Sequence, residues 1–504
     1  MHRLFDFALE PRLPNTEELY IRRNGCELSF DTYFNAIPIA KIKKYTAITE
    51  LIFDFEAKDT FEADICTEHE VIVSQTIDTS GKISVLIADI PDGSALLFPI
   101  VGTKTLRRIT VYAESKNVLD ISCALITCTY KRESYVTKNV NYLTGNLSHT
   151  TDFDCKIIVV DNGRTLTKSS FADEVVLLPN PNTGGSGGFG RGMREAVKIG
   201  GFTHLLLMDD DVEIDFAALQ RTLNFLKFLK PEYADISISG SMFYLDNPIR
   251  QFEAGGHFYE DGSQKGFGHF LDLSQQENLI INETGNDINY GGWWYMCMPI
   301  KYAQEGNFPL PFFLKYDDVE YALRCKQNII TLNGVGIWHE RFENKYNSSS
   351  EYYNTRNYLH LCRLYCKKFT KAKAKQFVSD SVKAKTDRQQ YQMAEAVMMG
   401  YSDYKKGLKY LQKIDPEKKH EQVCGLNYKF LTYDEIYSQY GFRPDDYTFY
   451  PPPDKTDSQE DVQPKEYVFT DMFQDVPEQY AGAEYAVHCD CIGNVGYVTQ
   501  KRKH

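Results

Sequence analysis

The chain has 504 residues, of which 42% are hydrophobic and 25% charged, and its formal net charge is −13. This length exceeds what one hydrophobic core normally serves, so we expect two to four domains. The composition is that of a globular protein, and the acidic balance argues against a nucleic-acid partner. The sequence lacks a long apolar run, and acidic residues near Met1 stand where a signal peptide has its apolar core, which predicts a cytoplasmic location.

Residues 1–118 are predicted to form a β-sandwich or jelly roll. Leu51, Phe53 and Phe55 alternate with more polar neighbours, as in a strand with one buried face. Further short apolar runs follow, separated by turn residues such as Asp92-Gly93. Because this segment contains no catalytic constellation, we interpret it as a binding or assembly module.

Residues 119–350 show a different pattern, in which buried strands alternate with helices. Apolar runs at 123–127 and 156–160 are separated by a helical segment at 133–143, and another apolar run precedes Asp209. Such alternation predicts a parallel sheet that is covered by helices on both faces.

A glycine-rich segment at residues 180–192 is predicted to be a turn that leads into a helix from Arg191. Gly185, Gly187 and Gly190 match the G-x-G-x-x-G spacing of a dinucleotide-binding loop. The match is incomplete, because the segment follows the third strand of the sheet whereas a dinucleotide fold usually opens with it. A turn of this kind lets the backbone approach a ligand closely and offers N–H groups to an anion.

Residues 351–440 are predicted to form a helical domain, and residues 441–504 an extended, partly disordered tail. Between residues 367 and 419 the sequence has 14 Lys and Arg against 6 Asp and Glu. A basic helical segment on an acidic protein can contact anionic lipid head groups, which predicts peripheral membrane contact. The alternative is a solvated helix face, because no stripe of Trp, Phe and Leu accompanies the charges.

Two acidic clusters, each at the end of an apolar run, carry the clearest functional signal. In an extended segment Asp209 and Asp211 share one face, so both can bind one divalent cation while Asp210 points away. Three adjacent carboxylates repel one another, which a cation would relieve. The second cluster, Asp317 and Asp318, offers a general base. The alternative for both clusters is a role as turn formers and helix caps.

Several further motifs accompany the Asp triplet: Thr127–Arg132, Asp161-Asn162-Gly163, Asn182 with the glycines, Asn289–Trp294, Leu310–Asp318 and Ile337–Glu340. Together these motifs resemble the family 2, GT-A-fold inverting glycosyltransferases, and more narrowly the bacterial polymerising galactofuranosyltransferases. The resemblance implies an α/β GT-A core, a Rossmann-like fold that binds nucleotide-diphospho-sugars, with an N-terminal β-sandwich and a C-terminal helical region.

The resemblance also implies roles for individual residues. Asp209, Asp211 and His339 would bind Mn²⁺ or Mg²⁺, although His339 could instead be a core histidine. Asp318 would be the general base, and Asp317 would cap the following helix beside the acceptor. The residues implied to contact the donor are Arg132, Asp161, Asn182, Gly185 and Asp210. Those implied to contact the acceptor are Trp293 and Trp294. The two Trp could also belong to the core.

Arg356 and Asn357 are predicted to contact the diphosphate or the acceptor, with an exposed position on a helix as the alternative.

The implied function is the transfer of galactofuranose from UDP-galactofuranose to a hydroxyl of a growing, lipid-linked cell-surface polysaccharide. The resemblance further implies a homo-oligomer at the inner face of the cell membrane. One alternative keeps this chemistry with a rhamnosyl or glucosyl donor. The others are a NAD-dependent dehydrogenase and a carbohydrate-binding protein without catalytic activity.

Overall fold

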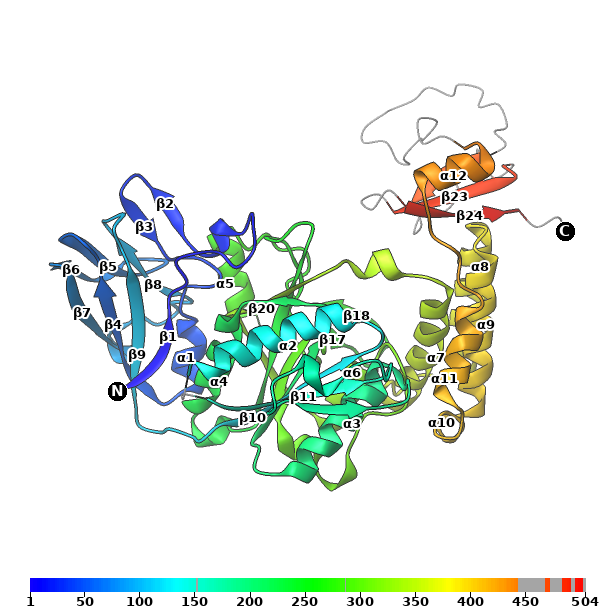
Figure 1. Cartoon of the computed structure of the whole chain (residues 1–504), viewed down its shortest axis with the longest axis horizontal. Helices are drawn as coiled ribbons and strands as arrows, with labels where there is room; N and C mark the ends of the chain where they lie inside the picture. Colours follow the sequence, from blue (N-terminus) through cyan, green and yellow to red (C-terminus); the bar gives the residue numbers. More distant parts are fainter. Residues whose placement is uncertain (151–152, 286, 443–466, 472–482, 491–494, 502–504) are drawn as a thin grey trace. The chain divides into compact units, whose positions relative to one another are not determined.

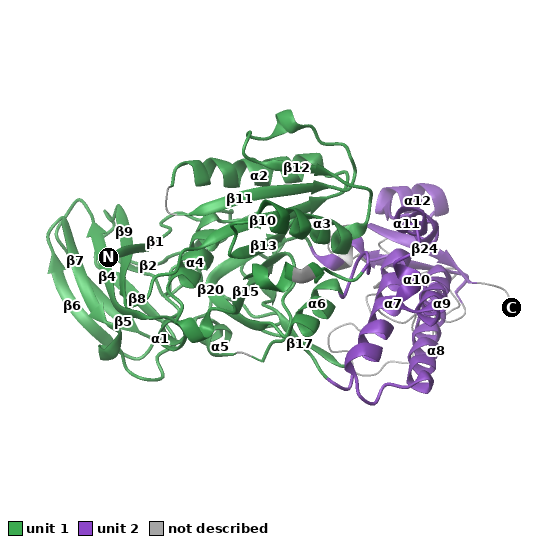
Figure 2. Cartoon of the chain, turned by 90° about the horizontal axis from the view of Figure 1, so that it is seen from below, with its two compact units in different colours: residues 1–259, 263–310, 317–340 green, residues 260–262, 311–316, 341–504 purple. Residues whose placement is uncertain are grey.

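In the computed structural model the chain divides into two compact units (Figure 2). The first contains residues 1–259, 263–310 and 317–340, and the second contains residues 260–262, 311–316 and 341–504. The structure describes residues 1–150, 153–285, 287–442, 467–471, 483–490 and 495–501. The division into four domains stays a prediction.

The N-terminal part of the first unit consists of two β-sheets, which confirms the predicted sandwich (Figure 1). Leu51, Phe53 and Phe55 are fully buried, because every second residue of their strand faces inward. The ring of Phe55 lies 6.1 Å from that of Phe61 in the other sheet. The first sheet has the order β1 (His2–Asp6), β9 (Arg108–Ser115), β4 (Ile48–Glu56), β7 (Ser80–Leu86), and the second the order β2 (Arg22–Asn24), β3 (Glu27–Ser29), β8 (Leu97–Val101), β5 (Phe61–Thr67), β6 (Val71–Ile77).

A nine-stranded mixed sheet forms the GT-A core of the first unit. Its strands run in the order β12 (Val176–Pro179), β11 (Asp154–Asp161), β10 (Ser122–Thr129), β13 (His204–Asp209), β19 (Tyr295–Pro299), β15 (Ile236–Tyr244), β20 (Asn328–His339), β14 (Glu213–Ile214), and β16 (Gln251–Glu253) pairs with β15. The first four are mutually parallel, and β19 is antiparallel to β13 and β15. Leu205 to Met208 of β13 are fully buried, as expected for a strand covered on both faces.

The helices and the small hairpin of the first unit complete this core. Helix α3 packs against β10 and β11, and α4 packs against β20 and β1. These elements are α1 (Ile39–Tyr45), α2 (Glu133–Ser148), α3 (Gly184–Ile199), α4 (Phe216–Lys227), α5 (Gln276–Thr284), α6 (Asp317–Cys325), β17 (Gly256–Phe258) and β18 (Gln264–Gly266).

The glycine-rich segment is helical, so the predicted turn at 180–192 is wrong over most of its length. Helix α3 begins at Gly184 instead of Arg191. A Cβ at Gly192 would lie 2.3 Å from Cγ2 of Ile126, and one at Gly188 would lie 2.8 Å from Cβ of Cys128. The glycines therefore allow α3 to pack closely against β10, and this packing outweighs the low helix propensity of glycine.

The second unit is mainly helical, as predicted, and part of the predicted tail forms strands. Its helices are α7 (Ser348–Tyr365), α8 (Lys371–Asp387), α9 (Tyr391–Lys406), α10 (Leu408–Leu411), α11 (Pro416–Cys424) and α12 (Tyr433–Tyr440), and a small sheet has the order β21 (Leu431–Thr432), β24 (Val495–Gln500), β23 (Tyr485–Asp490), β22 (Tyr467–Asp471). The predicted disorder at 443–466 and 472–482 lies outside the described residues. Within the described part of the chain, every helix is too short or too polar to cross a membrane.

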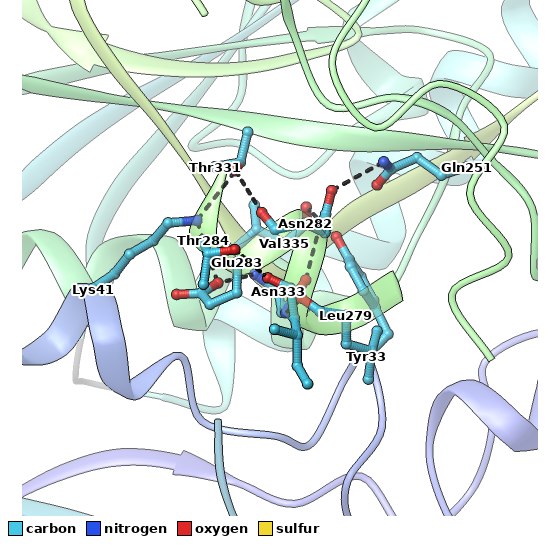
Figure 3. A network of polar contacts seen from close by, with 11 residues as sticks. Tyr33, Lys41, Gln251, Leu279, Asn282, Glu283, Thr284, Thr331, Asn333 and Val335 are labelled. Carbon is cyan, nitrogen blue, oxygen red and sulfur yellow. Dashed lines mark hydrogen bonds and ion pairs between the residues drawn. The ribbon is translucent and has the colours of Figure 1, made fainter. Parts of the chain in front are cut away.

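A buried ion pair links the N-terminal region to the nine-stranded sheet (Figure 3). Nζ of Lys41 in α1 lies 3.3 Å from Oε2 of Glu283 in α5 and donates a hydrogen bond to Thr331 in β20. Burial raises the pKa of Glu283 to about 7 and lowers the pKa of Lys41, and the attraction between them opposes both shifts. The hydroxyl of Tyr33 also donates to the carbonyl of Val335, at 2.8 Å. The N-terminal region and the sheet therefore share one polar network.

This network predicts that Lys41→Met destabilises the protein by about 3–5 kcal/mol, because it leaves the buried Glu283 without its cation. Urea denaturation followed by tryptophan fluorescence measures the loss. The control is Lys44→Met, an exposed lysine of the same helix, which should cost less than about 0.5 kcal/mol. The prediction would be contradicted if Lys41→Met and Lys44→Met had the same free energy of unfolding.

Candidate functional site

The carboxyl ends of the parallel strands β10, β11 and β13 lie side by side at one edge of the sheet. Their register pairs Thr129 with Asp161 and Cys128 with Asp209. In open α/β sheets this edge is where ligands bind. The sheet therefore places the first acidic cluster at the expected position of a ligand site.

Asp209, Asp211 and His339 come together at this edge, as the sequence predicts. Asp209 ends β13 and His339 ends β20, and each of the three residues offers a ligand atom within 4.8 Å of the others. Two carboxylates and one imidazole make a ligand set that suits Mn²⁺, and the two carboxylates alone could also bind Mg²⁺, which prefers oxygen ligands. The residues therefore fit the implied metal.

The hydrogen bond of His339 fixes which of its ring nitrogens is available. Nδ1 faces the carbonyl oxygen of Glu340, so Nδ1 carries the proton and donates it. Nε2 lies 3.2 Å from Oδ1 of Asp211. Because Nδ1 is engaged by this carbonyl, Nε2 is the ring nitrogen that faces the acidic cluster and could bind a metal.

The acidic cluster carries more negative charge than its surroundings offset. Burial raises the pKa of Asp209 to about 7, and the nearby Asp211 adds to this shift. Nη1 of Arg132 lies 2.6 Å from Oδ2 of Asp211 and 3.4 Å from Oδ1 of Asp210. Oδ2 of Asp210 is buried without a hydrogen-bond partner in the described part of the chain. One guanidinium faces three carboxylates, which favours the binding of a cation.

Asn139 of α2 is a positioning residue that the sequence analysis missed. Its side-chain amide donates to the carbonyls of Asp210, at 3.0 Å, and of Val212, at 2.7 Å. It is buried and so fixes the backbone that presents the acidic cluster. The only signal in the sequence is a polar residue between the apolar Val136 and Val140 of a helix.

Two of the residues assigned to donor binding already bind backbone groups. The carboxylate of Asp161 accepts hydrogen bonds from the backbone N–H groups of Gly163, Thr165 and Leu166 at 2.7–2.9 Å, which orders the loop after β11. Oδ1 of Asn182 accepts from the N–H of Gly184 at the start of α3, at 3.2 Å. Their contacts with a donor stay predictions.

Asp317 and Asp318 open helix α6, and Asp317 lies near the acidic cluster. A Cβ at Gly185 would lie 4.0 Å from Oδ2 of Asp317. Burial raises the pKa of Asp317 well above its usual range, and the charges of Asp318 and Asp209 add to this shift. Oδ1 of Asp318 accepts a hydrogen bond from the N–H of Val319, at 2.8 Å. Both carboxylates thus lie at the start of α6, and their separate roles stay predictions.

Trp293 and Trp294 are 6% and 7% exposed. The ring of Trp293 lies 5.4 Å from Phe189 and 5.8 Å from Tyr321. Nε1 of Trp294 donates to the carbonyl of Gly240, at 2.9 Å. These contacts are those of core residues, and the role of the two Trp in acceptor binding stays a prediction.

Comparison with known proteins assigns the first part of the nine-stranded sheet to a family. Residues 124–281 match the model of the family described as glycosyl transferase family 2. The chain carries a family 2 glycosyltransferase domain. This match confirms the resemblance found in the sequence. It argues against the alternative of a NAD-dependent dehydrogenase.

The glycosyltransferase domain also has relatives among characterised proteins. The galactofuranosyltransferase GlfT2 of Mycolicibacterium smegmatis is 26% identical over 377 residues, which cover 67% of this chain and 58% of that protein. GlfT2 of Mycobacterium tuberculosis is 25% identical over 359 residues, which cover 63% of this chain and 55% of that protein. The chain thus spans somewhat more than half the length of these relatives.

Among solved structures, the mannosyltransferase PcManGT of Pyrobaculum calidifontis is similar with a TM-score of 0.31 and 9% identity. The similarity covers 61% of this chain and 85% of that one. This likeness adds nothing to the family assignment.

Arg356 and Asn357 of the second unit hold the segment that leads into α6. Both are buried, so the predicted alternative of an exposed helix position is wrong. The side-chain amide of Asn357 donates to the carbonyls of Phe312, Leu314 and Lys315 at 2.7–3.0 Å, and Arg356 also donates to the carbonyl of Phe312. Phe313, Lys315 and Tyr316 have φ of 64–71°, a conformation that side chains rarely adopt unaided. The predicted contact of Arg356 and Asn357 with a ligand stays a prediction.

These contacts predict that Asn357→Asp lowers the turnover of the glycosyltransferase domain about tenfold or more. A carboxylate cannot donate to the three carbonyls, so the segment that runs directly into Asp317 and Asp318 loses its fixed shape, and small displacements of reacting groups are costly. Release of nucleotide from a sugar donor measures the effect. Asn354→Asp on the same helix is the matched control and should keep turnover near wild type. Full activity of Asn357→Asp would show that the segment does not depend on this residue.

Proposed function

We propose that the chain is a metal-dependent inverting glycosyltransferase that transfers galactofuranose from UDP-galactofuranose. The acceptor is a hydroxyl of a growing, lipid-linked cell-surface polysaccharide. The observation that supports this most directly is the convergence of Asp209, Asp211 and His339 at the ligand-binding edge of a family 2 glycosyltransferase domain. The choice of sugar rests on the galactofuranosyltransferases among its relatives.

Asp209, Asp211 and His339 would hold the divalent cation, Mn²⁺ or Mg²⁺. When bound, the cation would offset the negative charge that develops on the leaving diphosphate. Arg132 lies beside the same carboxylates and has further N–H donors for the ribose-phosphate part of the donor. Gly185 lies in the first turn of α3, whose free backbone N–H groups can bind a phosphate.

Asp161, Asn182 and Asp210 complete the proposed contacts with the uridine part of the donor. Trp293 and Trp294 would present their small exposed edges to the acceptor sugar, because sugar C–H faces pack well on aromatic rings. We also propose that the protein works as a homo-oligomer in peripheral contact with the inner face of the membrane. The excess of Lys and Arg between residues 367 and 419 supports the membrane contact.

Asp318 is the proposed general base. In an inverting reaction with a single displacement, the acceptor oxygen forms a bond to the anomeric carbon as the bond to the diphosphate breaks. The acceptor hydroxyl loses its proton in this step, and Asp318 takes it up. Asp317 lies near Gly185 and Asp209, and the choice of Asp318 over Asp317 as the base rests on the family resemblance.

The function is tested by incubating the protein with Mn²⁺ and a panel of nucleotide sugars. We expect UDP-galactofuranose to be turned over fastest. Asp211→Ala should lose Mn²⁺-dependent UDP binding in calorimetry, because it removes one ligand of the cation, whereas the exposed Asp173→Ala should bind as wild type does. Faster turnover of a rhamnosyl or glucosyl donor would replace the proposed sugar. Equal UDP affinity with and without a chelator would rule out the metal.

The base assignment predicts that Asp318→Asn slows transfer by about 10²–10⁴-fold while UDP and metal affinity stay near wild type. The substitution keeps the shape of the side chain and removes its basicity. Asp317→Asn is the matched comparison and should be milder. Steady-state transfer rates of both variants, together with UDP titrations, make the test. If the two variants exchange their behaviour, the base is Asp317.

A further inference from the structure

A strongly basic pocket lies among helices α7, α8, α9 and α10 of the second unit, which Figure 2 shows in purple. Its volume is about 770 Å³. Six cationic side chains from these four helices line it, and none of its lining residues is acidic: the cations are Arg363, Lys371, Lys375, Lys405, Lys406 and Lys409. This is a notable concentration of positive charge in a chain whose net charge is −13.

Most of these cations have no carboxylate partner. Lys406 pairs with Asp403, at 2.8 Å. The other five form no ion pair with any residue that the structure describes. Nζ of Lys405 lies over the ring of Tyr401, 4.8 Å from its centroid. Like charges gathered around one cavity repel one another, and a bound anion would relieve that repulsion.

A histidine that lines the pocket has a buried ring nitrogen without a partner among the described residues. His360 lines the pocket and is 2% exposed, and its Nε2 has no hydrogen-bond partner among the described residues. Its ring packs edge-on against that of Tyr404, with centroids 5.0 Å apart. Burial and the neighbouring Arg356 and Arg363 lower the pKa of His360 to about 4, so the ring is neutral at pH 7. A neutral ring can donate one N–H to a ligand oxygen, and a buried polar atom without a partner is costly.

The start of helix α8 adds to the positive potential. This 17-residue helix begins at Lys371, and Lys371, Ala374 and Lys375 of its first turns line the pocket. The side chain of Thr370 caps the N–H of Lys373, which leaves other first-turn N–H groups without an intrahelical partner. The N-terminal end of a helix favours anions, and phosphate groups in particular.

We propose that this pocket binds the phosphate groups of an anionic ligand, either a soluble diphosphate or the phosphodiester head group of a lipid. Lys and Arg in a concave site, a helix N-terminus and a neutral N–H donor form the set of groups that recognises phosphate oxygens. Five of its six cations belong to the basic segment 367–419 that we propose for membrane contact. None of its lining residues belongs to the proposed donor, acceptor or metal site, so the pocket does not depend on the proposed glycosyl transfer.

Calorimetry of the full chain with sodium pyrophosphate tests the site. A chelator in the buffer keeps divalent cations from bridging the probe to Asp209 and Asp211. The double variant K371A/K375A should bind pyrophosphate at least tenfold more weakly than wild type, and K371R/K375R should retain binding. The matched control K383A/K418A makes the same change in charge at two exposed lysines of the same unit and should bind as wild type does.

Vesicles separate the two sources of phosphate. Phosphatidylcholine vesicles with and without phosphatidylglycerol are sedimented with each variant. If K371A/K375A is the only variant that no longer sediments with the phosphatidylglycerol vesicles, the pocket is assigned to a lipid head group. Unchanged sedimentation, together with weaker pyrophosphate binding, assigns it to a soluble phosphate. The proposal is overturned if wild type does not bind pyrophosphate, or if both alanine double variants lose affinity equally.

Discussion

Repulsion among the carboxylates at the end of β13 is the constraint around which the first unit is organised. The sheet brings Asp209, Asp210 and Asp211 to one edge, where burial destabilises the charged form of the carboxylates. Several other elements contribute groups that limit this cost. Arg132 approaches from the start of α2, and His339 approaches from the end of β20. Placing charge in this way costs stability, which a bound cation would offset.

Close packing of the α3 backbone against β10 brings the N-terminal end of α3 near these acids. Gly188 and Gly192 allow the helix to approach Cys128 and Ile126 of β10 more closely than any side chain would permit. The first turn of α3 then lies beside Asp317 at the start of α6. The N-terminal ends of α3 and α6 thus lie close together at the edge of the sheet that carries the carboxylates. The glycines matter for packing, and they do so inside a helix rather than in a flexible loop.

The sequence predicted those features that depend on local pattern. Apolar runs identified β10, β11 and β13, and the spacing of Asp209 and Asp211 placed them on one face, whereas His339 was assigned only through family resemblance. The helix over Gly184–Gly190 was mispredicted, because the low helix propensity of glycine is a local property, whereas the packing of Gly188 against Cys128 is a contact distant in sequence. The Lys41–Glu283 pair and the role of Asn139 were invisible for the same reason. Each depends on a contact that forms only in the folded protein.

The buried pair between Lys41 and Glu283 has a consequence for how the protein is made. Lys41 is separated from Glu283 by 242 positions and from Thr331 by 290. During synthesis, which proceeds from the N-terminus, the β-sandwich leaves the ribosome long before α5 and β20 have been synthesised. Until then the lysine has no buried carboxylate to meet, and the surface that will carry α5 and β20 stays open to water and to other chains. Such delayed, long-range contacts slow folding and expose nascent chains to aggregation, so chaperone dependence of the first unit is an expected cost of this architecture.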